Sequence, residues 1–385
     1  MKKSYKGEKT MKLTSHERIM RIFKNQEIDR PALKLWGANL NLDRLLHPSY
    51  APVANLAKES SDLFVGGGFK FNIHAGANID KYAERYTKPT ADPDWNESYT
   101  VFHTPKGDLH MMKRVSTKGE PGYIMEHMIK EPEDIEKLLS MEYSPFSLDR
   151  SAYDSAVAKV GDRGIAMIGL AHAAYAVQEL LGSENLAYFS IDERDILHDL
   201  IKIYADRLLS HTKSILDLGI KEPVFSWVGP ELYLPPLMGG ADFEEFVHDM
   251  DKPIGDAIHN AGGYVWVHSH GKVANFIESF IDMGVDVLNP LEPPKNGDID
   301  MNDIIARFGN RIGWEGNIEI QEILTSSKER IASLIDECVE AGKRSGRFIL
   351  CPSAGYMEYP QPTEKYIDNL MFYLRYGLEA VERCR

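Results

Sequence analysis

Short apolar runs alternate with longer amphipathic stretches along most of this chain. The amphipathic stretches repeat their apolar positions every three or four residues, which is typical of helices with one buried face. The apolar runs are three to five residues long and are bounded by glycine, proline or polar residues, as buried strands are. Eight such runs are predicted as strands: residues 32–36, 63–65, 165–168, 224–228, 264–267, 285–289, 312–314 and 348–351.

This alternation of strands and helices predicts the fold class. Strands that alternate with helices form parallel sheets, because each crossover helix carries the chain back across the sheet. The chain lacks the glycine fingerprint of a nucleotide-binding fold, and eight strand–helix units favour a closed (β/α)8 TIM barrel over an open doubly wound sheet. We therefore predict an α/β protein with a single TIM-barrel domain at residues 13–385.

Two segments depart from the alternation. An N-terminal helical extension is predicted at residues 15–23, where Thr14 and Glu17 form a capping-box pattern. Residues 86–129 contain short alternating runs separated by turns rich in proline and glycine, which predicts a β-rich insertion. Residues 1–12 are polar, and we expect a mobile leader without the apolar segment of a signal peptide.

The composition narrows the location and the partners. The 385-residue chain has a formal net charge of −14, which disfavours nucleic acid and anionic membranes as partners. No apolar run approaches the roughly 18 residues of a membrane span. Three cysteines (Cys338, Cys351 and Cys384) are too few for a disulfide framework in a chain of this size. We expect a cytoplasmic protein with reduced thiols.

Two histidines stand at the end of the predicted strand at 264–267. His268 and His270 are two positions apart, so an extended backbone places both rings on the same face. Imidazole nitrogens are common zinc ligands, and a His-x-His pair is therefore a candidate half of a metal site. The simpler alternative is a pair of solvated or hydrogen-bonded histidines.

Other strand ends carry side chains of the same chemical types. In a TIM barrel these ends meet at one mouth, where active sites are built. The pattern predicts metal ligation by His268, His270, Glu292 and Cys351, and catalytic roles for Glu231, Glu292 and Asn317, with Glu231 as a further candidate for the metal shell. The structural alternative is that these residues belong to tight turns or lie near helix N-termini.

The last third of the chain resembles the uroporphyrinogen decarboxylase superfamily. The resemblance spans most of residues 14–385, is specific in the second half and is weak across the β-rich insertion. Its motifs are residues 281–294, 297–298, 308–311, 314–318 and 346–350, together with 15–23 and 29–31 near the start. Membership in this superfamily implies a (β/α)8 barrel, in agreement with the strand count.

The superfamily has two chemistries, and the first strand bears on the choice between them. True decarboxylases carry Arg-Gln-Ala-Gly-Arg after this strand, and the arginines hold substrate carboxylates. Here the place reads Leu-Trp-Gly-Ala-Asn, from Leu35 to Asn39, without arginine. A substrate with eight carboxylates would be hard to bind in a chain of net charge −14 that lacks these cations. The resemblance therefore favours the second chemistry, methyl transfer to or from a corrinoid protein with zinc at the barrel mouth.

The zinc-binding pattern of the methyltransferase branch is altered here. Members of that branch carry His-x-Cys after the central strand, a glutamate after the next strand, and a second cysteine in the last loop. His268 matches the histidine, His270 stands in the cysteine's place, and Glu292 lies near the glutamate. Ala354 falls on the second cysteine position, and Cys351 comes three residues earlier. Fewer thiolates give a harder, more Lewis-acidic zinc site, which suits cleavage of a methyl ether.

The resemblance thus implies a zinc-dependent methyltransferase of a corrinoid demethylating system. It would move a methyl group from a small methoxylated or methylated donor to a corrinoid (cobalamin) carried by a partner protein. The expected pocket is apolar and aromatic, with substrate-binding roles for Trp36, Asn39, Tyr233 and Glu315. A homodimer is a further possibility for the oligomeric state.

Two alternatives remain at this point. One is uroporphyrinogen decarboxylase itself, a cofactor-free lyase of porphyrin biosynthesis, with an aspartate such as Asp62 binding the pyrrole nitrogens. The other is a barrel that only binds a corrinoid or a tetrapyrrole. Zinc content separates the methyltransferase from the decarboxylase, and turnover of a methylated compound separates it from a binding protein.

Overall fold

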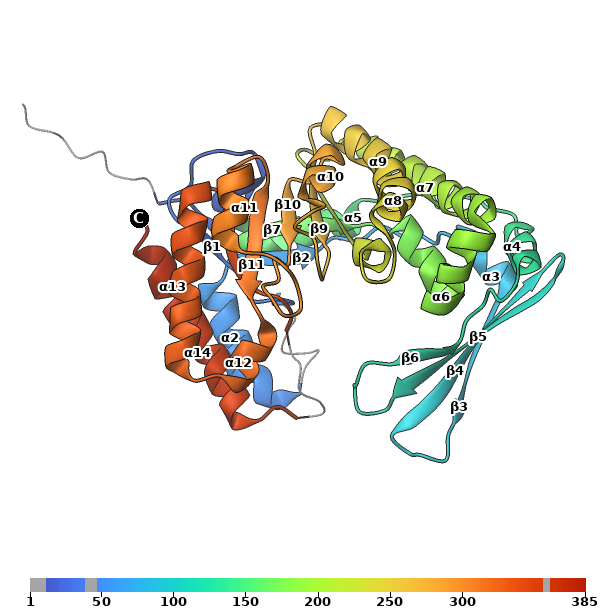
Figure 1. The fold of residues 1–385 in the computed structure, drawn as a ribbon, viewed down its shortest axis with the longest axis horizontal. Helices are drawn as coiled ribbons and strands as arrows, with labels where there is room; N and C mark the ends of the chain where they lie inside the picture. Colours follow the sequence, from blue (N-terminus) through green and yellow to red (C-terminus); the bar gives the residue numbers. More distant parts are fainter. Residues whose placement is uncertain (1–11, 39–46, 356–360) are drawn as a thin grey trace, which may run out of the picture.

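A curled sheet of eight parallel strands forms the centre of the computed structural model, which describes residues 12–38, 47–355 and 361–385. The strands follow the order β1-β12-β11-β10-β9-β8-β7-β2 (Figure 1). Their bounds are β1 Ala32–Leu33, β2 Leu63–Gly66, β7 Gly164–Gly169, β8 Val224–Val228, β9 Tyr264–His268, β10 Val287–Asn289, β11 Gly313–Ile318 and β12 Phe348–Pro352. The predicted TIM-barrel class is confirmed, and all eight predicted strands are present.

The seam between β1 and β2 brings the two ends of the sheet together. The Asp62 amide donates to the Leu33 carbonyl at 2.7 Å, and the Asp62 carboxylate accepts from the Leu33 amide at 2.8 Å. The same carboxylate contacts Arg18 Nη1 at 2.7 Å and Arg30 Nη1 at 3.3 Å. Because Asp62 directly precedes β2, these contacts lie at the N-terminal end of the barrel, away from the mouth.

An amphipathic helix covers that N-terminal end with its apolar face. α1 (Ser15–Phe23) begins with the predicted capping box of Thr14 and Glu17. Its buried Ile19 and Ile22 pack with side chains from the strands of the sheet, among them Phe64, Ile165, Val224, Val287 and Ile349. Burial of such side chains contributes about 1.5–3 kcal/mol each, so α1 is a stable plug at the bottom of the barrel.

Most of the remaining helices lie outside this sheet, and the two short helices at residues 79–82 and 132–139 lie against the antiparallel sheet that follows β2 (Figure 1). Those that precede β8 are α2 Ala51–Ser60, α3 Ile79–Tyr82, α4 Pro132–Leu139, α5 Ser151–Val160, α6 Ala173–Asp192 and α7 Arg194–Leu216. Those that follow it are α8 Gly240–Phe243, α9 Asp249–Asn260, α10 Ile277–Asp282, α11 Met301–Phe308, α12 Ile320–Thr325, α13 Lys328–Ser345 and α14 Glu364–Glu382. In the parts of the chain that the structure describes, no helix is long and apolar enough to cross a membrane.

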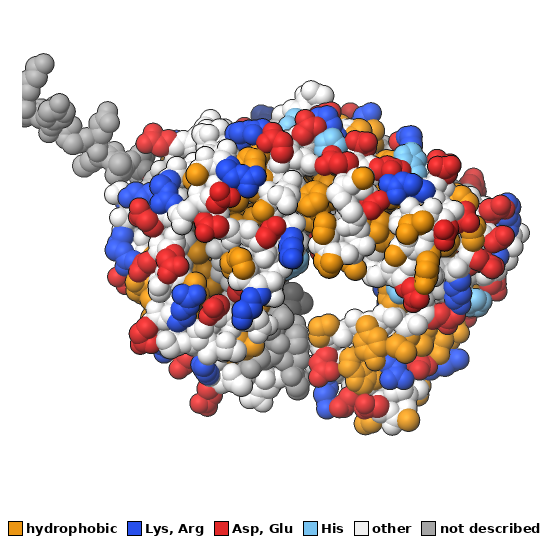
Figure 2. All heavy atoms as spheres, in the orientation of Figure 1, with side chains coloured by type: hydrophobic (Ala, Val, Ile, Leu, Met, Phe, Trp, Pro, Cys, Tyr) orange, Lys and Arg blue, Asp and Glu red, His pale blue; other side chains and the backbone are white. Residues whose placement is uncertain are grey.

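A separate antiparallel sheet follows β2. It consists of β3 (Ala83–Pro89), β4 (Trp95–Thr104), β5 (Gly107–Ser116) and β6 (Tyr123–Glu126), paired in sequence order. The sequence indicated the last three of these strands and missed β3. Since the sheet is inserted after a strand's C-terminal end, it stands on the mouth side, and Figure 2 shows the molecule hollowed between this sheet and the half that carries α12 and α14.

Candidate active site

The two predicted histidines lie together at the mouth. His268 is the last residue of β9, and its ring centroid is 4.4 Å from that of His270, with the rings nearly perpendicular at 88°. Trp36, which follows β1, stacks on His268 with ring centroids 4.4 Å apart. The structure therefore brings together residues from the first strand and the central strand, as the barrel closure requires.

His268 is buried and makes one side-chain hydrogen bond. Its Nδ1 lies 2.6 Å from Oδ1 of Asn289, the last residue of the neighbouring strand β10. Burial lowers the pKa of His268 to about 3, and the charge of His270 acts in the same direction. The ring is therefore neutral at ordinary pH, and within the described residues its Nε2 makes no hydrogen bond.

His270 forms an ion pair with Glu292. His270 Nδ1 lies 2.8 Å from Glu292 Oε1, and the Gly271 amide donates to Glu292 Oε2 at 2.7 Å. Burial lowers the pKa of His270, but the hydrogen bond and charge of Glu292 more than offset it, so the pKa is raised. Burial raises the pKa of Glu292, but the hydrogen bonds from His270 and Gly271 outweigh burial, so the pKa of Glu292 is lowered. Both shifts favour the charged forms.

Two further carboxylates face this pair with unsatisfied oxygens. Glu231 lies in the 3-10 turn Pro230–Tyr233 after β8, and its Oε2 is buried without a hydrogen-bond partner. Burial raises the pKa of Glu231, against the opposing charges of His270 and His172. Glu319, just beyond β11, likewise buries an Oε1 without a partner, and burial together with the charge of Glu292 raises its pKa. Acceptor atoms are thus left unused around His270.

Glu315 lies deeper in the barrel. The predicted strand at 312–314 put Glu315 just past its end, and this prediction is wrong. Glu315 lies inside β11 and is fully buried. Its Oε1 lies 2.7 Å from Lys34 Nζ and accepts from Asn289 Nδ2 at 3.0 Å, while its Oε2 accepts from Trp266 Nε1 at 2.8 Å. A side chain that is enclosed in this way does not contact a ligand at the mouth.

The other predicted site residues lie elsewhere. Tyr233 is fully buried, donates its hydroxyl to the Ala174 carbonyl and packs on Phe246. Cys351 is fully buried within β12 beside Glu315, and burial raises the pKa of its thiol well above the usual value. Asn317 donates to the Leu291 carbonyl and lies 3.9 Å from Cys338 of α13, outside the sheet. Asn39 lies outside the described residues.

The sequence reasoning missed three buried polar residues near the site. Lys34 interrupts the apolar run of the first strand, and a cation in such a run signals a buried partner. Asn289 ends its strand directly before Pro290, and no local pattern predicts its side-chain contact to His268. His172 follows β7 and pairs with Asp251 at 2.7 Å.

The structure holds the donors that zinc prefers but does not gather them into a closed shell. Within the described residues, no group of three or more His, Cys, Asp and Glu side chains is arranged to hold a metal ion. Glu292 is engaged by His270 and Gly271, and Cys351 lies below the mouth. Among the described residues, His268 Nε2, Glu231 Oε2 and Glu319 Oε1 make no hydrogen bond, and all three are atoms of kinds that coordinate zinc.

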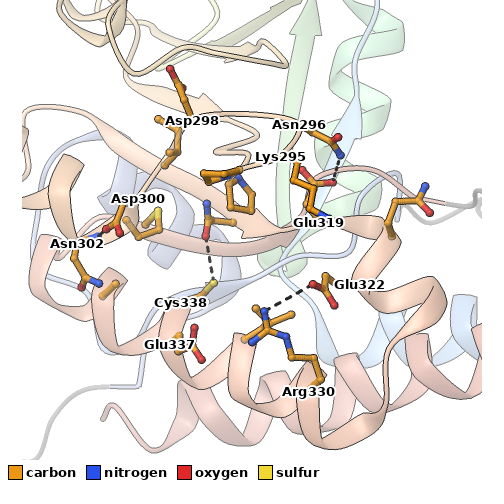
Figure 3. A pocket seen from close by; sticks show the side chains of 18 of the residues that line it. Lys295, Asn296, Asp298, Asp300, Asn302, Glu319, Glu322, Arg330, Glu337 and Cys338 are labelled. Atoms are coloured by element: carbon orange, nitrogen blue, oxygen red, sulfur yellow. Dashed lines mark hydrogen bonds and ion pairs between the residues drawn. The ribbon is translucent and has the colours of Figure 1, made fainter.

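A cavity of about 640 Å³ lies on the outside of β11, between α11, α12 and α13 (Figure 3). Asn317, Glu319 and Cys338 line it, and neither histidine of the mouth does. Two of its acidic groups are already engaged, because Glu322 contacts Arg330 and Asp300 caps α11. We therefore place the active site at the mouth.

Comparison with known sequences and structures identifies the family. The sequence model of the uroporphyrinogen decarboxylase family, URO-D, matches residues 112–366, which is more than half of the chain. The chain belongs to this family. No curated protein sequence matches it. The structure of a methyltransferase from Methanosarcina mazei matches with a TM-score of 0.58 and 13% identity, over 94% of this chain and 98% of that one. At this identity the likeness shows the fold.

Two other solved structures match more weakly. A xyloglucanase from Bacteroides ovatus has a TM-score of 0.34 and 10% identity, over 58% of this chain and 59% of that one. A muconate lactonizing enzyme from Pseudomonas putida has a TM-score of 0.25 and 11% identity, over 77% of both chains. Neither likeness is close enough to bear on function.

Proposed function

We propose that this member of the URO-D family is a methyltransferase of a corrinoid demethylating system. In this proposal a small methoxylated or methylated compound loses its methyl group to a corrinoid carried by a partner protein. The observation that carries the proposal is His268: a neutral, buried imidazole at the mouth whose Nε2 is unbonded among the described residues and available to a ligand. The methyltransferase from Methanosarcina mazei, which shares the fold along nearly the whole of both chains, supports it.

The surroundings of His268 suit a heteroatom leaving group. When bound, zinc would act as a Lewis acid on the oxygen or nitrogen that gives up the methyl group. His268 would hold it, with Glu231 and Glu292 as the neighbouring donors. The raised pKa of His270 favours a role in carrying a proton to the leaving heteroatom. Trp36 offers a flat apolar surface on which the substrate packs.

The decarboxylase alternative receives less support. The two arginines of the decarboxylase motif are absent between Leu35 and Asn39. Asp62, the candidate for binding pyrrole nitrogens, is fully engaged by Arg18, Arg30 and the Leu33 amide at the opposite end of the barrel. A carboxylate so occupied has no oxygen to offer a tetrapyrrole.

The test combines metal analysis with turnover. We expect protein purified without chelators to contain zinc, and His268→Ala to lose it. A matched control is His198→Ala, since His198 lies on α7 and pairs with Asp199. A methoxylated aromatic compound and a methylated amine, each with added corrinoid protein, should show transfer by the wild type and the control. Decarboxylation of uroporphyrinogen at the rate of a dedicated decarboxylase would contradict the proposal.

A further inference from the structure

A line of hydrogen-bonded side chains crosses the interior of the barrel and ends at His268. It runs from Lys34 on the first strand to Glu315 on β11, then to Asn289 on β10, and then to His268 on β9. The three contacts measure 2.7, 3.0 and 2.6 Å. Glu315 and Asn289 are fully buried, so water does not replace any partner in the middle of the line.

The donors and acceptors along this line can be assigned from chemistry alone. Lys34 Nζ and Trp266 Nε1 only donate, and they meet opposite oxygens of Glu315. Glu315 is therefore an acceptor on both sides, and the group that Asn289 turns toward it must be the amide NH2. The other end of the Asn289 amide is then the carbonyl oxygen, which faces His268 Nδ1.

The orientation of Asn289 determines where His268 carries its hydrogen. An amide oxygen can only accept, so His268 Nδ1 must donate. A neutral imidazole has one N–H, and its second nitrogen then bears a lone pair. We propose that Asn289, oriented by Glu315 and Lys34, is a positioning residue that holds His268 as the Nδ1–H tautomer and leaves Nε2 as the acceptor atom of the mouth.

This inference deepens the proposed function, on which it rests only for its consequence in catalysis. Partners behind a metal-binding histidine orient the ring and select its tautomer, and their loss typically weakens metal binding about 10–100-fold. Here the partner is a neutral amide, and the charge of Glu315 stays one residue away, balanced by Lys34. The tautomer itself is a property of the metal-free protein and can be measured without substrate, corrinoid or zinc.

The direct experiment is nuclear magnetic resonance of the full-length, metal-free protein with ¹⁵N-labelled histidine. Long-range ¹H–¹⁵N correlations distinguish a protonated Nδ1 from a protonated Nε2 in each neutral ring. The signals of His268 are assigned by their absence in His268→Gln. We expect Nδ1 protonated and Nε2 bare, and the reverse pattern in the wild type would overturn the proposal.

Two substitutions of Asn289 separate positioning from simple packing. Asn289→Leu removes the acceptor, so the ring hydrogen should move to Nε2, where water can accept it. Asn289→Asp keeps an acceptor for Nδ1 but sets a second carboxylate against Glu315. We expect Asn289→Asp to retain the Nδ1–H tautomer although it is the less stable variant. A purely structural role of Asn289 predicts that the tautomer of His268 does not change in Asn289→Leu.

A matched control is Asn369→Leu. Asn369 is another buried asparagine, on α14, whose amide donates to the Ile323 and Ser326 carbonyls. It should destabilise the protein without altering the His268 signals.

Zinc titration supplies a second measurement: Asn289→Leu should bind zinc about 10–100-fold more weakly than Asn369→Leu. If the wild type binds no zinc, the proposed function loses its metal while the tautomer result still decides this inference. Retention of Nδ1–H in Asn289→Leu would refute it.

Discussion

Two clusters of charged side chains lie at opposite ends of the barrel, and they differ in how completely their atoms are paired. In the seam cluster, Asp62 accepts from Arg18, Arg30 and the Leu33 amide, and Arg18 also binds Asp29. In the mouth cluster of Glu231, His268, His270 and Glu292, the Glu231 Oε2 is buried without a partner. Both clusters are expensive to bury. In the seam cluster the buried Arg30 Nε makes no hydrogen bond but lies 3.2 Å from Glu382 Oε1, so it still has an ionic partner, whereas Glu231 Oε2 at the mouth has no hydrogen-bond partner. Full pairing indicates a structural role, and incomplete pairing indicates a site.

The largest effect is expected at the seam. Asp62→Asn removes the charge that two buried arginines share, and breaking such a pair costs about 3–5 kcal/mol. Urea-induced unfolding of the variant and the wild type measures this loss. A loss below about 1 kcal/mol would contradict the structural role assigned to this cluster.

A smaller effect is expected at the mouth. Glu292→Gln keeps one acceptor for either His270 or Gly271 and loses the charge, so the free energy of unfolding should fall by about 1.5–3 kcal/mol, the range for one hydrogen bond to a charged group. The pKa of His270 should fall as well, because Glu292 is what raises it. An NMR titration of His270 in both proteins measures the second effect. An unchanged pKa would show that Glu292 does not control this histidine.

The two clusters should respond to acid in different pH ranges. The pKa of His268 is lowered to about 3 in the folded state, below the usual 6.5, so the unfolded chain binds the proton first. Its neutral burial stabilises the protein fully above pH 6.5, and this stability is lost as the pH falls from 6.5 toward 3. Burial raises the pKa of Asp29 less than Arg18 lowers it, so its contribution is lost only below about pH 3.8.

Unfolding measured between pH 7 and 4.5 tests this difference. His268→Gln should reduce the slope of stability against pH by up to about 1.4 kcal/mol per pH unit, the value for one proton. Asp29→Asn should lower stability throughout this range and leave the slope unchanged. Equal slopes for the wild type and His268→Gln would contradict the neutral burial of His268.

The smallest effect is expected away from both clusters. Arg311 and Glu278 form an ion pair at 2.5 Å, with side chains 49% and 63% exposed. Glu278→Gln should cost no more than about 1 kcal/mol, because water and salt screen exposed pairs. The same unfolding assay measures it. A loss of stability as large as that of Asp62→Asn would mean that the energy of an ion pair does not depend on its burial.

The sequence predicted the strands well and the interior of the barrel poorly. Apolar runs such as 224–228 are strands that bury side chains on both faces, among them Val224 and Phe225, and this apolar character is a local property of the sequence. The predicted strand at 312–314 stops directly before Glu315, whereas β11 continues through Glu315 to Ile318. A buried carboxylate needs a partner, and the partner of Glu315 is Lys34, 281 positions away. No local pattern contains that information.

For the candidate site, the sequence predicted which residues lie near strand ends but not where their side chains point. His268, His270 and Glu292 could be found because they lie at strand ends or within three residues of them, and the strand ends of a barrel converge. Whether a side chain at such an end faces the mouth, the core or the outer helices depends on packing between distant segments. Tyr233 turns into the core and Asn317 turns toward α13 for that reason.

The apolar plug formed by α1 has a kinetic consequence. A barrel closed at one end has a single entrance, so under the proposed function a small methyl donor and a large protein acceptor would share it. The donor would have to enter before the acceptor covers the opening, and the demethylated product would leave only after the acceptor has moved away. Steady-state kinetics should therefore show an obligatory order of addition, with excess acceptor protein inhibiting the reaction by trapping the product inside.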